Sequence, residues 1–333
     1  MTITAEAPPE ARQKPAHRPY RVRVAALRAL SPHFVRVTFT GDDLGDFGVD
    51  GLDQRIKLVL PLEATGYDTF PTDDWWPSWR ALPAHEQNAF RTYTARAVRP
   101  EAREVDVDFV SHGDQGAAAS WLARTRVGDE AMLIGPDATS GVTGSGVEWA
   151  PGRASTVMIA GDETAVPAIS SIVESLPADA RGCVFLEVPT ADDVLPLVAP
   201  PGVTVHWLPR AGSAAPAADG AADARSDSDT DTDTDTAYGA PLQTAVRAWT
   251  ARYVTAWHRG VDLEEVDIEH DILWDVPQGE AQHGAALQGE LYAWLAGEAG
   301  AIKALRRFLV SEVGVDRRQV AFMGYWRLGR AEM

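Results

Sequence analysis

The sequence has one cysteine, Cys183, in 333 residues, so no disulfide can form within the chain. It has no Cys-x-x-Cys pair, and its eight histidines show no paired metal-ligand spacing. These absences argue against a bound structural metal or an iron–sulfur cluster. Because Cys183 lies in an apolar run with Val184, Phe185 and Leu186, we expect a buried structural thiol.

Long hydrophobic runs and an excess of positive charge are also missing. No stretch approaches the roughly 20 apolar residues of a membrane helix, and residues 1–17 lack the apolar core of an export signal. We therefore expect a cytoplasmic protein with no membrane contact, and, because no exposed apolar stripe stands out, a monomer. The net charge of −18 argues against nucleic acid as a partner.

Part of the negative charge lies in residues 211–239, which hold seven aspartates and one arginine. This segment is rich in Ala, Gly and Pro and ends in Ser-Asp and Thr-Asp repeats, so it cannot bury enough apolar surface to order itself. We expect a disordered acidic loop insertion. An acidic docking segment for a basic partner and a calcium-binding repeat are the alternatives, although the repeats lack the glycine of a calcium loop.

The chain is long enough for two domains after a disordered arm at residues 1–17. Alternating apolar and polar residues predict an antiparallel Greek-key β-barrel over residues 18–150, with one helix near Ala118. The barrel strands include 20–24, 35–39 and 55–60. A long connection at 67–87 carries Trp75, Trp76 and Trp79, which serve either a functional loop or local packing.

Residues 151–333 change to continuous apolar strands that alternate with helices, which is typical of a parallel sheet covered on both faces. Strands are expected at 156–160, 183–188, 203–208, 291–296 and 320–325, and helices at 165–176, 242–257 and 301–310. A barrel followed by such a nucleotide-binding α/β domain is the ferredoxin-NADP-reductase-like arrangement.

The stretch Arg91-Thr92-Tyr93-Thr94-Ala95-Arg96 alternates as an extended strand does, so that Arg91 and Tyr93 share one face and Thr94 lies on the other. A guanidinium for phosphate, a ring for stacking and a nearby hydroxyl suit a flavin nucleotide. Taken alone, an Arg/Tyr-rich barrel strand is the simpler interpretation.

A second segment follows, in which Asp108 to Gly113 ends a strand and Gly116 to Leu122 begins a helix with small side chains. Backbone N–H groups at such a helix start approach a pyrophosphate closely, and the helix dipole favours its charge. Ser120 is then either a phosphate ligand or an ordinary serine of the first helical turn.

The sequence here resembles the siderophore-interacting protein family, the flavin-dependent ferric-siderophore reductases. The resemblance runs from about Tyr20 to Gly329 and rests on five motifs in order. These are Arg91-x-Tyr93-Thr94-x-Arg96, Asp108 to Trp121, Gly161 to Ala168, Trp294-Leu295-Ala296-Gly297-Glu298 and Gly324-Tyr325-Trp326-Arg327.

The resemblance implies an FAD site in the barrel. Arg91 would pair with a phosphate, Tyr93 would stack beside the isoalloxazine, and Thr94 would hydrogen-bond near its N5. Further cofactor-lining residues would be Val110, His112, Ala119 and Ser120. His112 has an alternative role as a loop histidine that caps local backbone.

The resemblance also places Asp162, Glu163, Thr164 and Ala165 where FAD meets the incoming nicotinamide dinucleotide, although Asp162 and Thr164 are also suited to capping a helix. NADPH sites need a cation for the 2′-phosphate, whereas NADH sites often carry an acid for the ribose. Residues 187–193 hold acids and no Arg or Lys. We therefore expect NADH rather than NADPH.

Ferric siderophores are often anionic, so an acidic protein needs local cations to attract them. The resemblance supports Lys57 and a helix cluster of Lys303, Arg306 and Arg307 as substrate contacts; a solvated helix face is the alternative for the cluster. Asp137 stands where some family members carry a basic residue, which changes the expected charge of the pocket.

The expected activity is an FAD-dependent reduction of a ferric siderophore by NADH or NADPH that releases Fe(II), with no side chain acting as an acid or base. A flavin reductase that serves a protein acceptor is one alternative. A non-catalytic, flavin-containing siderophore-binding protein is another, although such a protein has no use for a hydroxyl near flavin N5.

Overall fold

The computed structural model describes residues 14–111, 116–211, 238–253, 266–268, 271–277 and 291–329. The predicted arm up to residue 13, His112 and most of the predicted acidic insertion, at 212–237, lie outside the described residues. In the described residues, no helix is both long and apolar enough to cross a membrane.

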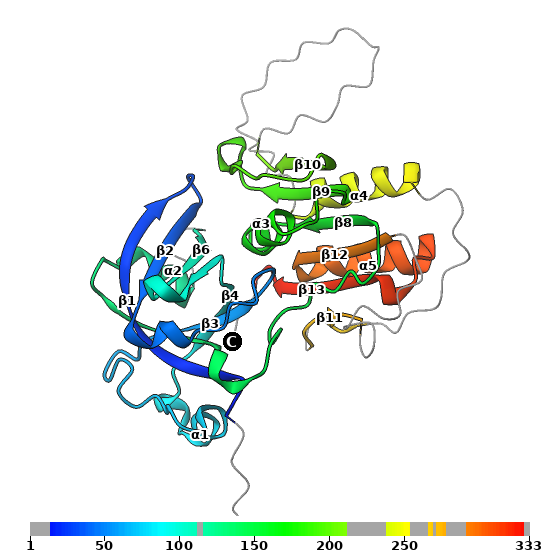
Figure 1. Cartoon of the computed structure of the whole chain (residues 1–333). Coiled ribbons are helices and arrows are strands. Elements are labelled where there is room, and N and C mark those ends of the chain that lie inside the picture. Colours follow the sequence, from blue (N-terminus) through cyan, green and yellow to red (C-terminus); the bar gives the residue numbers. More distant parts are fainter. Residues whose placement is uncertain are drawn as a thin grey trace, which may run out of the picture.

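Two sheets form two lobes that lie side by side (Figure 1). The first sheet is antiparallel, with the order β4-β3-β7-β1-β2-β6-β5. Its strands are β1 (His17–Ala29), β2 (Phe34–Thr40), β3 (Arg55–Val59), β4 (Phe90–Thr94), β5 (Ala97–Arg99), β6 (Glu104–Val110) and β7 (Glu130–Pro136). Its helices are α1 (Trp75–Ala81) and α2 (Ala117–Arg124).

The outer strands of this sheet, β4 and β5, are separated in the chain only by Ala95 and Arg96. The sheet therefore has to curl until its two edges approach each other, which gives the expected flavin-domain barrel. Side chains alternate between the two faces of each strand, so every second residue of β6 points into the barrel. These inward residues, Val105, Val107 and Phe109, are at most 1% exposed.

The second sheet has the order β10-β9-β8-β12-β13-β11 and is parallel except for β11. Its strands are β8 (Thr156–Gly161), β9 (Arg181–Val188), β10 (Gly202–Pro209), β11 (Trp274–Asp275), β12 (Leu291–Glu298) and β13 (Val320–Trp326). The helices are α3 (Val166–Glu174), α4 (Ala240–Tyr253) and α5 (Ala299–Arg306).

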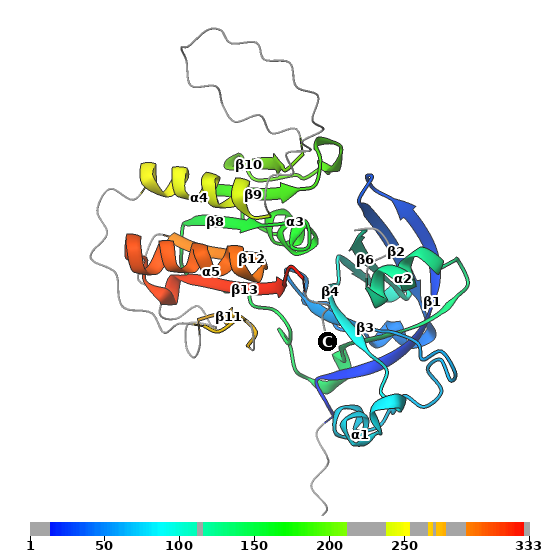
Figure 2. The ribbon, with the colours of Figure 1, turned by 180° about the vertical axis from the view of Figure 1, so that it is seen from behind.

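Helices cover both faces of this sheet, as its apolar strands require (Figure 2). Helix α3 packs through Ile169 and Ile172 on one face, and α4 and α5 pack through Val246 and Ile302 on the other. Two packed lobes of this kind make the fold the expected ferredoxin-NADP-reductase-like one. The predicted domain boundary at residue 150 falls between β7 and β8 and stays a prediction.

Some helix limits differ from the prediction for local reasons. Helix α5 begins at Ala299 rather than Ala301, because the Glu298 carboxylate caps it by accepting from the Ala301 N–H. Its end runs on as a π-helical segment, Arg307–Val313. Helix α3 ends at Glu174 rather than Leu176.

Candidate functional site

Three aromatic rings connect the barrel segments in which the sequence predicts FAD contacts. Tyr93 of β4 lies 4.4 Å from Phe109 of β6 between ring centroids, and Phe109 lies 5.7 Å from Trp121 of α2. Tyr93 is half-buried, so part of the tyrosine remains exposed. The two motifs that are well separated in the sequence are therefore neighbours in space.

Strand β4 divides its side chains as the alternation predicts. In the pairing of β4 with β3, Arg91 lies opposite Leu58 and Tyr93 lies opposite Ile56. Leu58 and Ile56 face the barrel core. Thr94 lies on the other face and is 7% exposed. The Arg91 guanidinium donates to the Phe90 carbonyl at 3.0 Å, and the side chain is half-buried at the edge of the sheet.

The start of α2 fits a pyrophosphate. Gly116 has a φ of 100°, and no side-chain hydrogen bond from the described residues caps the helix. The first N–H groups of a helix have no partner within it, and here they belong to the small residues Ala117, Ala118 and Ala119. Ser120 and Val110 are half-buried nearby. The donor set therefore suits FAD, whose phosphates need such N–H groups.

At the carboxyl edge of the second sheet, the predicted segment 162–165 is more buried than a contact surface would be. Asp162 is 2% exposed, and Glu163 and Ala165 are fully buried. Thr164 keeps partial exposure. Among these four residues, Thr164 is therefore the one that a ligand can reach from solvent.

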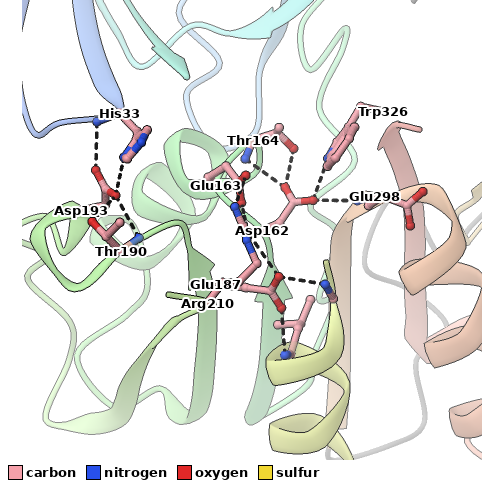
Figure 3. Close-up of polar contacts among 12 residues, drawn as sticks. His33, Asp162, Glu163, Thr164, Glu187, Thr190, Asp193, Arg210, Glu298 and Trp326 are labelled. Atoms are coloured by element: carbon pink, nitrogen blue, oxygen red, sulfur yellow. Dashed lines mark hydrogen bonds and ion pairs between the residues drawn. The ribbon is translucent and has the colours of Figure 1, made fainter. Parts of the chain in front are cut away.

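Asp162 accepts hydrogen bonds from several directions (Figure 3). Its Oδ1 accepts from the N–H and the hydroxyl of Thr164, with the N–H at 2.9 Å. Its Oδ2 accepts from the Glu298 N–H at 2.7 Å and from the Trp326 indole N–H at 2.8 Å. Burial, and then the charge of Glu163, raise the pKa of Asp162 to about 6.

Glu163 and Glu187 hold one arginine, Arg210, which follows β10. Its guanidinium donates to both carboxylate oxygens of Glu163, at 2.6 and 2.7 Å, and to Glu187 at 3.2 Å. Although burial alone would lower the pKa of Arg210, its bonds to Glu163 raise it, so the charge is retained. The guanidinium also lies 4.1 Å from the centroid of the Tyr238 ring.

Two of the three acids that suggested an NADH ribose contact, Glu187 and Asp193, have other partners. Glu187 is fully buried and accepts from the Gly239 and Leu242 N–H groups at the start of α4. Asp193 is also fully buried and binds the β1–β2 turn. Of the acids in that segment, Asp192 is exposed. These partners cannot be read from the sequence, because capping and pairing by a carboxylate leave no pattern of residues along the chain.

The predicted substrate cations separate into two groups. Lys57 is half-buried, with its ammonium 3.2 Å from the Thr92 hydroxyl, Lys303 is half-buried, and Arg307 is exposed. Arg306 differs, because it is 6% exposed and its Nε donates to Asp275 at 2.8 Å. This burial is unsuited to an open substrate surface.

The tryptophan-rich connection is packed locally. Trp76 stacks on Trp79 at 5.4 Å, and the indole N–H groups of Trp75 and Trp79 donate to the carbonyls of His17 and Asn88. Of the two roles expected for these tryptophans, a functional loop or local packing, these contacts correspond to local packing. In the described residues, no group of three metal-binding side chains gathers, and Cys183 is a buried free thiol.

Contacts between the lobes involve residues that the sequence did not single out. The Asp193 carboxylate accepts from the Ser31 hydroxyl at 2.7 Å and from the His33 N–H at 3.0 Å, and it lies 2.8 Å from His33 Nδ1. The motif residue Arg96 pairs with Glu174 of α3 at 2.6 Å. These contacts connect the barrel to the second sheet close to its carboxyl edge.

Comparison with known families matches both halves of the chain. The siderophore-interacting FAD-binding domain matches residues 23–140, and the siderophore-interacting protein family matches residues 154–329. An uncharacterised Mycobacterium tuberculosis protein is 33% identical, covering 93% of this chain and 90% of its own length. The ferric vibriobactin reductase ViuB of Vibrio cholerae is 34% identical over 54% of this chain and 63% of its own length.

Solved structures agree with the fold. The siderophore-interacting protein SipS of Aeromonas hydrophila aligns with a TM-score of 0.62 and 28% identity, covering 95% of this chain and 94% of SipS. The ferredoxin reductase of carbazole 1,9a-dioxygenase aligns with a TM-score of 0.53 at 15% identity, covering 93% of this chain and 70% of its own, and shares the fold alone. The chain belongs to the siderophore-interacting protein family and carries its FAD-binding domain.

Proposed function

We propose that this protein is an FAD-dependent ferric-siderophore reductase that takes electrons from a nicotinamide dinucleotide in the cytoplasm. The observation that carries the proposal is the contact series Tyr93–Phe109–Trp121, which gathers the predicted FAD residues of β4, β6 and α2. The similarity to the Vibrio cholerae ferric vibriobactin reductase supports the choice of acceptor.

The reaction needs a carrier that accepts two electrons together and passes them on singly, and bound FAD supplies this chemistry. The overall balance is one NAD(P)H and two Fe(III) giving NAD(P)⁺, one proton and two Fe(II). Iron leaves after reduction because the oxygen ligands of a siderophore hold Fe(III) far more tightly than Fe(II).

The residues of the chain bind and orient in this proposal. The N–H groups at the start of α2 and the Arg91 guanidinium bind phosphate, Thr94 places its hydroxyl beside the flavin, and Tyr93 packs against the ring. Thr164 offers a partly exposed hydroxyl to the donor at the edge of the second sheet. Water exclusion comes from the buried Phe109 and Trp121 beneath Tyr93.

NADH is the proposed donor. Residues 189–211, all of them described, run from the end of β9 to just past β10 and contain a single Lys or Arg, which is Arg210. Two glutamates hold this arginine in the interior. A 2′-phosphate would therefore find no available cation from that segment.

The cations Lys57, Lys303 and Arg307 are the proposed attraction for an anionic ferric siderophore. All three residues have exposed surface, in a protein whose net charge of −18 repels anions elsewhere. Reversal of charge at Lys57 and Arg307 together should raise the KM for the ferric siderophore and leave flavin reduction by NADH unchanged.

The test is an anaerobic assay of the purified flavoprotein with NADH or NADPH, a ferric siderophore and ferrozine to trap Fe(II). Ferrozine colour that needs both the flavin and the nucleotide supports the proposal, and the faster nucleotide identifies the donor. Reduction of the flavin without Fe(II) contradicts the proposed acceptor and points to a protein acceptor.

A further inference from the structure

Asp162 connects three separate segments at the carboxyl edge of the second sheet. It lies just after β8, and its donors come from the start of α3, from the end of β12 and from the end of β13 (Figure 3). The carboxylate is 2% exposed. Because both of its oxygens already accept two hydrogen bonds each, little capacity remains for a ligand.

The backbone around Asp162 is shaped to admit the carboxylate. The pairing of β12 with β13 shifts register, so that Gly297 faces Gly324 but Glu298 faces Trp326, and Tyr325 is the extra residue of a β-bulge. The bulge brings the Glu298 N–H and the Trp326 indole to the same oxygen. Gly297 has a φ of 150°, and a Cβ there would lie 2.6 Å from Asp162 Oδ2.

The hydrogen bonds to Asp162 favour an ionised carboxylate. The N–H groups of Thr164, Glu298 and Trp326 can only donate, one to Oδ1 and two to Oδ2. An asparagine, or a protonated aspartic acid, presents a hydrogen on one side and therefore sets a donor against at least one of these groups. Buried donors without an acceptor are costly, so we expect Thr164 and Trp326 to shift when the carboxylate is replaced.

We propose that Asp162 is a positioning residue of the nicotinamide site, which holds Thr164 and Trp326 in place and contacts neither the donor nor the flavin. The inference rests on the proposed function for its effect on the reaction. Thr164, Glu298 and Trp326 are all partly exposed. Asp162 holds the side chains of Thr164 and Trp326, whereas it accepts only from the backbone N–H of Glu298, so Thr164 and Trp326 present the side-chain surface that Asp162 fixes. Tyr238 supports Trp326 edge-on at 5.1 Å.

The first test is spectroscopic and independent of activity. The indole N–H resonance of Trp326, assigned through its loss in Trp326→Phe, should shift in Asp162→Asn in the FAD-loaded protein. The matched control is Asp179→Asn, an exposed aspartate in the α3–β9 connection, which should leave the resonance in place. An unchanged Trp326 resonance in Asp162→Asn overturns the positioning role.

The second test is rapid mixing of the FAD-loaded protein with NADH in the absence of iron. Displacement of positioning groups costs on the order of 10- to 100-fold in rate, so Asp162→Asn should lower the limiting rate of flavin reduction by about this factor. The Kd for NADH should change by a smaller factor than the limiting rate, because Asp162 acts on NADH only through Thr164 and Trp326. A raised Kd with an unchanged limiting rate overturns the proposal, since it means direct binding.

Trp326→Phe keeps an aromatic side chain but removes the indole N–H from which Asp162 accepts a hydrogen bond, which makes it the second variant if Asp162→Asn fails to fold. It should slow flavin reduction in the same direction; a limiting rate equal to that of the wild type overturns the proposal. If neither NADH nor NADPH reduces the wild-type flavin, the proposed donor is wrong, and the indole resonance still decides whether Asp162 positions Trp326.

Discussion

At the scale of single residues, the proposed FAD site can be tested at the side chain of Tyr93. Tyr93→Ala removes the ring that packs on Phe109 at 4.4 Å and opens the proposed flavin-facing surface. We expect a several-fold loss of FAD retained on purification, measured as the ratio of flavin to protein absorbance. Tyr93→Phe keeps the ring and should retain most of the bound FAD. Undiminished flavin in Tyr93→Ala would remove this residue from the site.

We predict that Asp162 makes the proposed flavin reduction depend on pH. Its pKa, raised to about 6, means that protonation breaks the hydrogen-bond set as the pH falls through 6. The folded protein then binds this proton more readily than the unfolded chain does between about pH 4 and 6, so protonation of Asp162 does not destabilise the fold. The limiting rate of flavin reduction should therefore fall below pH 6 while the protein stays folded.

Several charged or titratable groups surround this carboxyl. Glu163 raises its pKa and is itself paired with Arg210, while Tyr325 lies within electrostatic range and Glu298 uses its side chain to cap α5. Asp162→Asn distinguishes the titration of Asp162 from that of its neighbours. In this variant the limiting rate of flavin reduction, plotted against pH, should lack the step near pH 6. A step of the same size in Asp162→Asn would assign the titration to one of these neighbours.

At the scale of elements, the end of β12 depends on a glycine. Gly297→Ala would force a side chain into a φ of 150° and against Asp162 Oδ2. Such strain costs about 1–3 kcal/mol, so the midpoint of urea unfolding should fall. Gly45→Ala is the control, since a Cβ there meets nothing within 4 Å. Equal midpoints for Gly297→Ala and the wild type would mean that the strand end adapts without strain.

The strands and most helices follow from the sequence because each has its own local signal. Alternation predicts β6, and continuous apolar runs predict β8 and β12. The short helix α1 was not predicted, since its residues Trp75–Ala81 have no clear helical period. The bulge at Tyr325 was also missed, because it depends on pairing between two strands and on the carboxylate of a third segment.

At the scale of the whole molecule, the contacts between the lobes include a buried carboxylate. Asp193 is fully buried between Thr190, Ser31 and His33. Burial alone would raise its pKa, but the hydrogen bonds from Ser31, Thr190 and His33 lower it overall. The resulting stabilisation is present above the pKa of the unfolded carboxyl, near 4, and is lost as the pH falls through the lower folded value.

Asp193→Ala should lower the free energy of unfolding by about 2–3 kcal/mol, because it leaves buried donors without an acceptor. The neighbouring exposed Asp192 is the matched control, and its alanine variant should stay within about 0.5 kcal/mol of the wild type. Urea unfolding at pH 7 measures both. Equal losses for the two variants would show that the Asp193 contacts carry no particular stability.

The site was predicted less completely than the fold, for a physical reason. Residue type and spacing indicated Arg91, Tyr93 and the start of α2, because these lie within continuous motifs. Arg210 and Tyr238 were missed, since they reach the cluster from distant parts of the chain. The burial of Arg306 was also not foreseen, because its partner Asp275 is 31 residues away and a helical charge pattern does not show such a partner.

The measurement that tests the account most directly is Fe(II) formation from a ferric siderophore under anaerobic conditions, followed with ferrozine. The account predicts two Fe(II) for each NADH consumed, no Fe(II) from protein stripped of FAD, and a slower reaction in Asp162→Asn. Oxidation of NADH with no Fe(II), or Fe(II) formation that persists without FAD, would contradict it.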